Sequence, residues 1–314
     1  MKQAKVHLAS VAFATIFGFT FMFSKVALDF VMPIGLIAYR FLVAIVVFEL
    51  LRRVRVVKIT FSVERFKAVF WVALFQPVMY FLFEINGLAR VPSGEAGMMI
   101  ALIPVIATVL SALILKEKPR ALQVFFILLS VSGIVFIQVS HAAGGVDFDG
   151  LGYALMFGAV VAAALFNIAS RSASRNMKAH EITYYMMLFG AVVFNVIYVT
   201  VLISQGRLGD YLGNLAQPQL VVPVLYLGIL ASIVAFFLVN FALSRLEVHV
   251  SSVYANLATV TAVFAGAVFL REALYFYHII GGAMIIIGVY GTARLNRGTR
   301  RFRKAQPLKE DYRV

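Results

Sequence analysis

The stretch LILKEKP at residues 113–119 returns 155 positions later as VFLREAL at residues 268–274. In both copies an apolar run ends in a basic residue followed by a glutamate: Lys116–Glu117 and Arg271–Glu272. A long repeat inside a hydrophobic chain is typical of membrane proteins that arose by duplication. The two copies therefore indicate a chain built from two related halves.

The repeat extends without a gap over residues 88–137 and 243–292. A charged residue and a glycine are kept at matching positions: Arg90 and Arg245, Gly133 and Gly288. Both copies lie at the same point in a ladder of hydrophobic segments, so we expect each half to contain an equivalent set of helices.

The composition identifies the solvent of this chain. Of its 314 residues, 62% are hydrophobic and 13% are charged, and the mean hydropathy is +0.93. Soluble domains carry roughly 25% charged residues, so this chain is expected to lie in a bilayer. The sequence contains no cysteine, which excludes disulfides and thiolate chemistry.

Ten segments contain about the 20 mostly apolar residues that a spanning helix requires. They lie near 5–28, 33–51, 67–88, 94–115, 121–140, 150–171, 181–204, 219–243, 248–270 and 274–293. We therefore predict an all-α membrane protein with one five-helix repeat over 1–140, a second over 150–293 and a basic tail over 294–314.

Basic residues set the expected orientation, because cytoplasmic loops are enriched in Lys and Arg. With a cytoplasmic N-terminus, only Arg90, Arg207 and Arg271 of the loop and tail cations fall outside. Ten helices then place both termini in the cytoplasm. Five helices per half make the second half enter the membrane from the opposite side, which predicts an inverted repeat and alternating access.

The net charge of +14 is concentrated in particular loops and in the tail. A basic tail after a last membrane helix normally contacts anionic lipid headgroups. We therefore expect membrane lipids as partners of the tail, and no nucleic acid.

The ordered combination of residues in the first half resembles that of a known family. It includes Lys25, Pro33, Arg40, Tyr80 and Pro104, together with the repeated Lys/Arg–Glu element described above. The chain resembles the drug/metabolite transporter superfamily, most closely its EamA-type branch. This resemblance implies a ten-helix carrier in the bacterial plasma (inner) membrane that exports or exchanges small metabolites, amino acids prominent among them.

Three residues depart from the pattern of that family. Thr259 stands in the second half where Pro104 stands in the first, and Glu84 and Glu95 are acidic residues that the family pattern does not include.

Charged residues inside spans indicate a watery cavity or ion pairs, since each costs about 2.5–3.5 kcal/mol at the bilayer centre. Lys25, Arg40, Glu84 and Glu95 lie at similar depth in the first four helices. They could lock the helices together as ion pairs. Alternatively, Arg40 or Lys25 binds a carboxylate or phosphate, and Glu84 binds an amine or a coupling proton.

Gln76, Tyr80 and Glu84 recur every four residues and so share one stripe of a helix. Such a stripe predicts either a cavity wall or a packing surface against the first helix.

The second half lacks these charges, since Met187 stands roughly at the place of Arg40 and Val239 at that of Glu84. It offers amides instead, and Asn167, Asn240 and Asn256 are candidate substrate contacts. The alternative for these amides is hydrogen bonding between helices. The sequence therefore predicts an asymmetric site.

No sequence feature points to catalysis. The five histidines are not paired at metal-ligand spacing, and no nucleotide-binding loop or hydrolase motif is present. We expect a secondary-active transporter of a small molecule, with no metal, cofactor or catalytic residue. The alternatives are an importer or exchanger of phosphorylated or nucleoside-like solutes and, from other classes, a membrane enzyme or a lipid scramblase.

Overall fold

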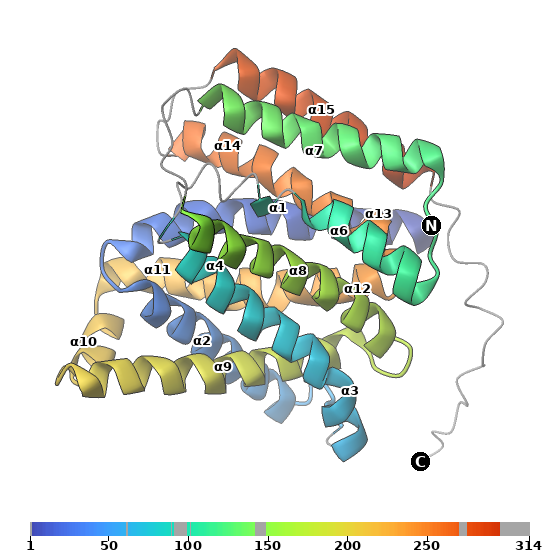
Figure 1. Cartoon of the computed structure of the whole chain (residues 1–314). Helices are drawn as coiled ribbons and strands as arrows, with labels where there is room; N and C mark the ends of the chain where they lie inside the picture. Colours follow the sequence, from blue (N-terminus) through green and yellow to red (C-terminus); the bar gives the residue numbers. More distant parts are fainter. Residues whose placement is uncertain are drawn as a thin grey trace.

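The computed structural model describes residues 2–60, 62–88, 90, 99–100, 102–141, 149–269 and 275–295, and all regular elements in these ranges are helical. Eight helices in this part of the chain are long and apolar enough to cross a membrane: Ala4–Leu28, Pro33–Arg53, Val63–Gly87, Gly150–Ala173, Ala179–Ser204, Pro218–Leu243, Val248–Phe269 and Phe276–Arg294. Two shorter apolar helices cover Ile103–Leu115 and Ala121–Ile137. The protein is an all-helical membrane protein (Figure 1).

The described helices fall into two sets, here called the first half (residues up to 141) and the second half (residues from 149). The first half contains α1 (Lys2–Leu28), α2 (Pro33–Arg53), α3 (Val63–Ala73), η1 (Leu74–Met79), α4 (Tyr80–Leu88), α6 (Ile103–Leu110), η2 (Ser111–Leu115) and α7 (Ala121–His141). The second half contains α8 (Gly150–Ala173), α9 (Ala179–Ser204), α10 (Asp210–Leu215), α11 (Pro218–Leu225), η3 (Tyr226–Ala235), α12 (Phe236–Leu243), α13 (Val248–Val253), η4 (Tyr254–Asn256), α14 (Leu257–Phe269) and α15 (Phe276–Arg294).

Several helices begin where the sequence supplies a cap. Pro33 opens α2, a position at which proline loses no helical hydrogen bond. The Ser62 hydroxyl accepts a hydrogen bond from the Arg65 backbone N–H (3.2 Å), and the Asp149 carboxylate accepts one from the Gly152 N–H (2.9 Å). These local signals determine the first residues of α2, α3 and α8.

The third span differs from its prediction. It begins at Val63 rather than near residue 67, and it is not one continuous helix, because Gln76 adopts extended backbone angles (φ −149°, ψ 119°). Pro77 follows directly, and proline both lacks a backbone donor and disfavours helical geometry in the residue before it.

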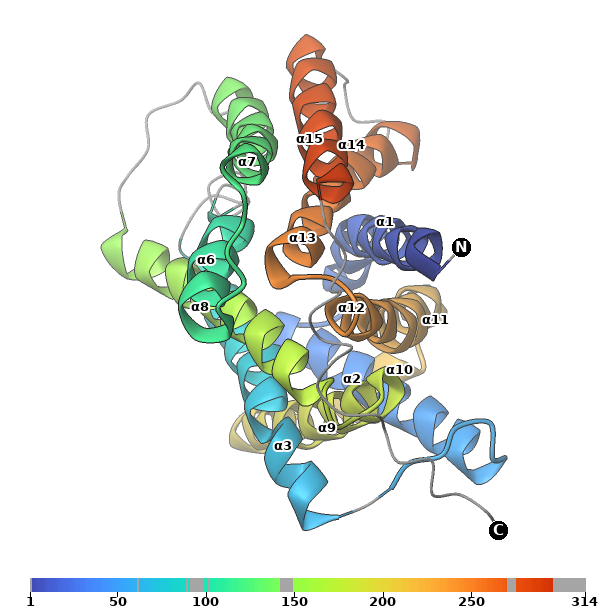
Figure 2. The same ribbon diagram turned by 90° about the vertical axis from the view of Figure 1, so that its right-hand side faces the viewer.

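Each half packs a corresponding helix against corresponding helices of the other half (Figure 2). Helix α1 of the first half packs against α14 and against the continuous segment α11–η3–α12 of the second. Helix α8 of the second half packs against α6 and against α3–η1–α4 of the first. Exchanging the halves therefore reproduces the packing scheme.

The most extensive contact between the halves, among the described helices, is made by α7 and α15, which lie side by side in both views (Figures 1 and 2). A Cβ atom added at Gly133 would lie 2.6 Å from the Gly281 carbonyl oxygen. One added at Gly288 would lie 2.6 Å from that of Phe126. The two contacts are equivalent under the 155-residue repeat, so the packing of α7 and α15 is reciprocal. Gly133 meets Gly281 and Phe126 meets Gly288, so residue numbers rise along one helix as they fall along the other, and the two helices are antiparallel.

Some predicted features lie outside the described residues. They are the side chain of Lys25, the whole of Glu95, the Arg271–Glu272 element and the tail beyond residue 295.

Alanine at Gly133 or Gly288 should destabilise the protein. Each new methyl group would meet backbone of the facing helix, and overpacking costs about 1–3 kcal/mol. Thermal unfolding of the purified protein in detergent micelles measures the effect. Gly282→Ala is the matched control on α15, since a Cβ there meets nothing within 4 Å. Equal melting temperatures for all three variants would contradict the close approach of α7 and α15.

Candidate functional site

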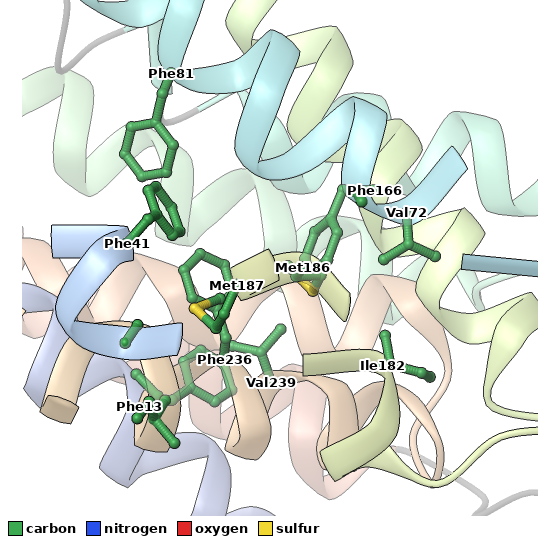
Figure 3. Close-up of a cluster of buried hydrophobic side chains, with 14 of the residues drawn as sticks. Phe13, Phe41, Val72, Phe81, Phe166, Ile182, Met186, Met187, Phe236 and Val239 are labelled. Atoms are coloured by element: carbon green, nitrogen blue, oxygen red, sulfur yellow. The ribbon is translucent and has the colours of Figure 1, made fainter. Parts of the chain in front are cut away.

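A cavity of about 490 Å³ lies between the two halves. Its walls come from α1, α2, η1, α4 and α6 of the first half and from α8, η3, α12, α13 and α14 of the second. Most lining side chains are apolar, and Phe13, Phe81, Phe166, Phe236 and Val239 are seen together in Figure 3. A mainly apolar cavity with a few polar groups is the usual form of a small-molecule site.

Arg40 is the cationic group of this cavity among the described residues. It lies on α2 and is 8% exposed. Its Nε donates a hydrogen bond to the Ser232 hydroxyl (2.7 Å), and its Cζ lies 5.2 Å from the centre of the Phe81 ring and 5.7 Å from that of Phe41. The two rings lie next to each other in Figure 3, edge to face, and they stabilise the cation by cation–π interaction.

Glu84 and Tyr80 form the opposing polar group, on α4. The Tyr80 hydroxyl donates to Glu84 Oε1 (3.1 Å), and both residues line the cavity. Glu84 and Arg40 interact electrostatically, but among the described residues no salt bridge joins them. The cavity therefore carries two opposite charges that do not neutralise each other by direct contact.

Gln76 also lines the cavity, at the interruption between α3 and α4. The predicted stripe of Gln76, Tyr80 and Glu84 thus faces one space, although the backbone between the first two is not a regular helix.

The three candidate asparagines occupy different environments. Asn167 on α8 lines the cavity. Asn240 is fully buried outside the lining, where its amide donates to Thr183 Oγ1 (2.9 Å) and accepts from the Ser170 hydroxyl (2.6 Å). Asn256 donates to Ser130 Oγ on α7 (3.0 Å). The amides of Asn240 and Asn256 therefore form hydrogen bonds between helices and do not border the cavity.

Further polar groups of the lining were not singled out from the sequence. The cavity is also bordered by the hydroxyl side chains of Thr20 and Ser24 on α1 and of Ser251 and its neighbour Ser252 on α13. The spacing of Thr20 and Ser24 with Phe13 and Phe17 on one helical face is a signal that could have identified them.

Helix α9 contributes none of the described lining residues. It packs instead against α2, α3 and α12.

A buried ion pair joins the two halves beyond the lining of the cavity. Arg171 donates from Nε to Glu117 Oε1 (3.1 Å) and from Nη1 to the Leu243 carbonyl oxygen (2.8 Å), while the Val248 N–H donates to Glu117 Oε2 (2.9 Å). We call Glu117, Arg171, Leu243 and Val248 the clamp. Burial raises the pKa of the nearby Glu247 carboxyl, and the charge of Glu117 adds to this effect.

The clamp lies one helical turn beyond Asn167 on α8 and just before Ser251 on α13. The lining extends in the other direction to Leu28 and Pro33, where α1 ends and α2 begins. The lining thus begins about one helical turn from the clamp and extends away from it, toward the opposite end of the bundle.

Among the described residues there is no group of His, Asp or Glu that could hold a metal ion. Two separated opposite charges in an apolar space can orient a small dipolar molecule.

A family model of EamA-like transporters matches residues 4–139 and again 150–294. The chain belongs to the EamA-like transporter family. It is similar to the uncharacterized transporter YcxC of Bacillus subtilis (strain 168), with 33% identity over 98% of this chain and 99% of that protein.

This EamA-like transporter also has more distant relatives. The probable terminal-alkyne amino-acid exporter of Streptantibioticus cattleyicolor is 27% identical over 68% of this chain and 69% of the exporter. A solved crystal structure that is 20% identical superposes with a TM-score of 0.75 over 94% of this chain and 98% of its own, which shows a shared fold.

These relatives are named as transporters rather than enzymes. The chain is accordingly a transporter and a multi-pass integral membrane protein. The bacterial source of these relatives indicates the plasma membrane.

Replacing Asn240 should destabilise this EamA-like transporter more than replacing Asn167. Asn240→Ala leaves the buried Ser170 hydroxyl without its acceptor and removes the donor to Thr183, at a cost of about 1–3 kcal/mol, whereas Asn167→Ala removes an amide that borders the cavity. Thermal unfolding in detergent measures both. A larger loss for Asn167→Ala would reverse the assignment of the two residues.

Proposed function

We propose that this EamA-like transporter is a secondary carrier that exports a small, amino-acid-like metabolite by alternating access. The observation that carries the proposal is the cavity between the halves, with a guanidinium on α2 and a carboxylate on α4. Its volume of about 490 Å³ falls within the range of roughly 300–1,000 Å³ for small-molecule sites.

The charges favour a zwitterion. Arg40 is suited to a carboxylate, because its guanidinium donates parallel hydrogen bonds. Glu84, which accepts from Tyr80, is suited to an ammonium group. The surrounding Phe side chains would receive an apolar substituent, so one molecule with all three features would satisfy the cavity. The name of the amino-acid exporter from Streptantibioticus cattleyicolor supports both the substrate class and the direction.

The proposed architecture is ten spans in two inverted five-helix repeats, over 1–140 and 150–293. Two matches of the family model, the interchangeable packing of the halves and the reciprocal antiparallel contact of α7 with α15 support it. A two-fold axis perpendicular to two spanning helices lies in the membrane plane, which is the symmetry of inverted repeats.

The proposed orientation has both termini in the cytoplasm and the basic tail over 294–314 against anionic lipid headgroups. The distribution of Lys and Arg supports it. The clamp would then close the cytoplasmic end of the cavity, because Glu117 follows the fourth predicted span.

Reconstitution in proteoliposomes tests the function. Counterflow of radiolabelled amino acids, sugars, nucleosides and organic phosphates, with and without a pH gradient, should reveal transport of amino acids. Arg40→Gln should lower that transport at least about tenfold, since truncating one partner of a buried charge pair costs about 2–5 kcal/mol. Arg207→Gln is the matched control, because Arg207 is exposed and pairs with Asp210 outside the cavity.

Two outcomes would contradict the proposal. A correctly inserted protein that moves no solute of the panel is not a carrier of these classes. Transport of organic phosphates in place of amino acids would replace the proposed substrate class with the phosphorylated one.

Weakening the clamp should open the end of the cavity that we propose it closes. The chain has no cysteine, so a single Ser252→Cys at the cavity reports accessibility without background. Adding Glu117→Gln should raise labelling by a membrane-impermeant maleimide from the clamp side by about tenfold, because a neutral amide lacks the charge that pairs with Arg171 across the halves, which weakens the state in which they are joined. Asp210→Asn, in an exposed pair, should leave labelling unchanged. Equal labelling in the Glu117→Gln background would show that the clamp is no gate.

A further inference from the structure

The guanidinium of Arg40 is held by a hydroxyl group of the other half. Ser232 is fully buried on η3, and its Oγ accepts from Arg40 Nε (2.7 Å). The same hydroxyl donates its only hydrogen to the Leu227 carbonyl oxygen (2.8 Å). With the hydrogen committed to Leu227, a lone pair of Ser232 faces Arg40, so the hydroxyl acts as a fixed acceptor.

The backbone of η3 makes this contact possible. Leu227 lies five residues before Ser232, in keeping with the wide turns of η3, which often occur at functional sites. Gly228 faces α2 one residue later, and a Cβ there would lie 2.7 Å from Val43 Cγ1 and 3.0 Å from the Arg40 carbonyl oxygen. The absence of a side chain at Gly228 therefore lets η3 approach α2 at the level of Arg40.

Two aromatic rings complete the support. The Phe81 and Phe41 rings lie near the guanidinium carbon, and Nε is already bonded to Ser232. Among the described residues, no hydrogen bond or salt bridge is made by the two terminal nitrogens, Nη1 and Nη2, and Arg40 lines the cavity. These two nitrogens are thus the donors left for a bound molecule.

We propose that Ser232 and Gly228 are positioning residues that hold Arg40 end-on, so that Nη1 and Nη2 together receive a carboxylate. This inference rests on the proposed function, because it assigns the geometry of the same site. The second half lacks a charge at the place of Arg40, and here it supplies the support for the charge of the first half. Loss of the support leaves the guanidinium present but free to turn, which weakens binding of the carboxylate and leaves the other steps of transport intact.

Counterflow kinetics test the proposal. The probe is the panel amino acid that the wild type moves fastest, for instance L-leucine, together with the amine that lacks its carboxylate, 3-methylbutylamine. Ser232→Ala should raise the half-saturation concentration of the amino acid about tenfold, as expected for losing a hydrogen bond to a charged group, with the maximal rate retained. Inhibition by the amine should not change, and Ser232→Thr, which keeps the hydroxyl, should restore the wild-type value.

Gly228→Ala should act like Ser232→Ala, because it pushes η3 away from α2. The matched controls are Ser130→Ala, which removes an equally buried hydroxyl that accepts from Asn256 outside the cavity lining, and Gly282→Ala. If Gly228→Ala fails to fold, the serine variants still decide.

The outcomes separate the two proposals. An unchanged half-saturation concentration in Ser232→Ala, or an equal rise for the amine, overturns the positioning role while the carrier function stands. A wild type that moves no amino acid overturns the proposed function and this inference with it.

Discussion

A lipid bilayer solvates neither a peptide group nor a charge, and the organisation of this protein follows from that constraint. Backbone hydrogen bonds must be made within each spanning segment, which is why all regular elements of the described residues are helices. Side-chain charges must find partners inside the bundle. Arg40 is bonded to the Ser232 hydroxyl and lies beside two aromatic rings, and Glu117 is paired with Arg171, so each of these charges of the first half has a partner in the second.

The sequence predicted the helical membrane fold and the transporter class because both depend on periodic, additive signals. Apolar length identifies spans, and the EamA-like match agrees with the family resemblance. Arg40, Tyr80 and Glu84, which line the cavity, could be singled out from the sequence because a charge or a polar stripe is rare inside a span. Pro77 signals a kink or hinge in the third span, but proline in a membrane helix is often tolerated, and only the packing decides that the helix is interrupted at Gln76.

Contacts across the halves were beyond the reach of the sequence for a physical reason. Asn240, Asn256 and Asn167 are the same kind of residue within apolar spans, and the neighbouring helix decides which of them borders the cavity. Ser232 gave no signal at all, because a serine in a membrane helix can bond to its own backbone as readily as to a neighbour. Its relation to Arg40 exists only once η3 lies against α2.

The bond between Arg40 and Ser232 crosses from one half to the other, and this has a consequence for how the protein releases its cargo. In a carrier whose halves rock, the distance between these residues differs between its two states. The grip on a carboxylate would then be strong in the state in which Ser232 reaches Arg40 and weak in the other. The Ser232 hydroxyl would thereby couple substrate affinity to conformation. The motion that exposes the cavity to the other side of the membrane would also weaken the binding of the carboxylate to Arg40.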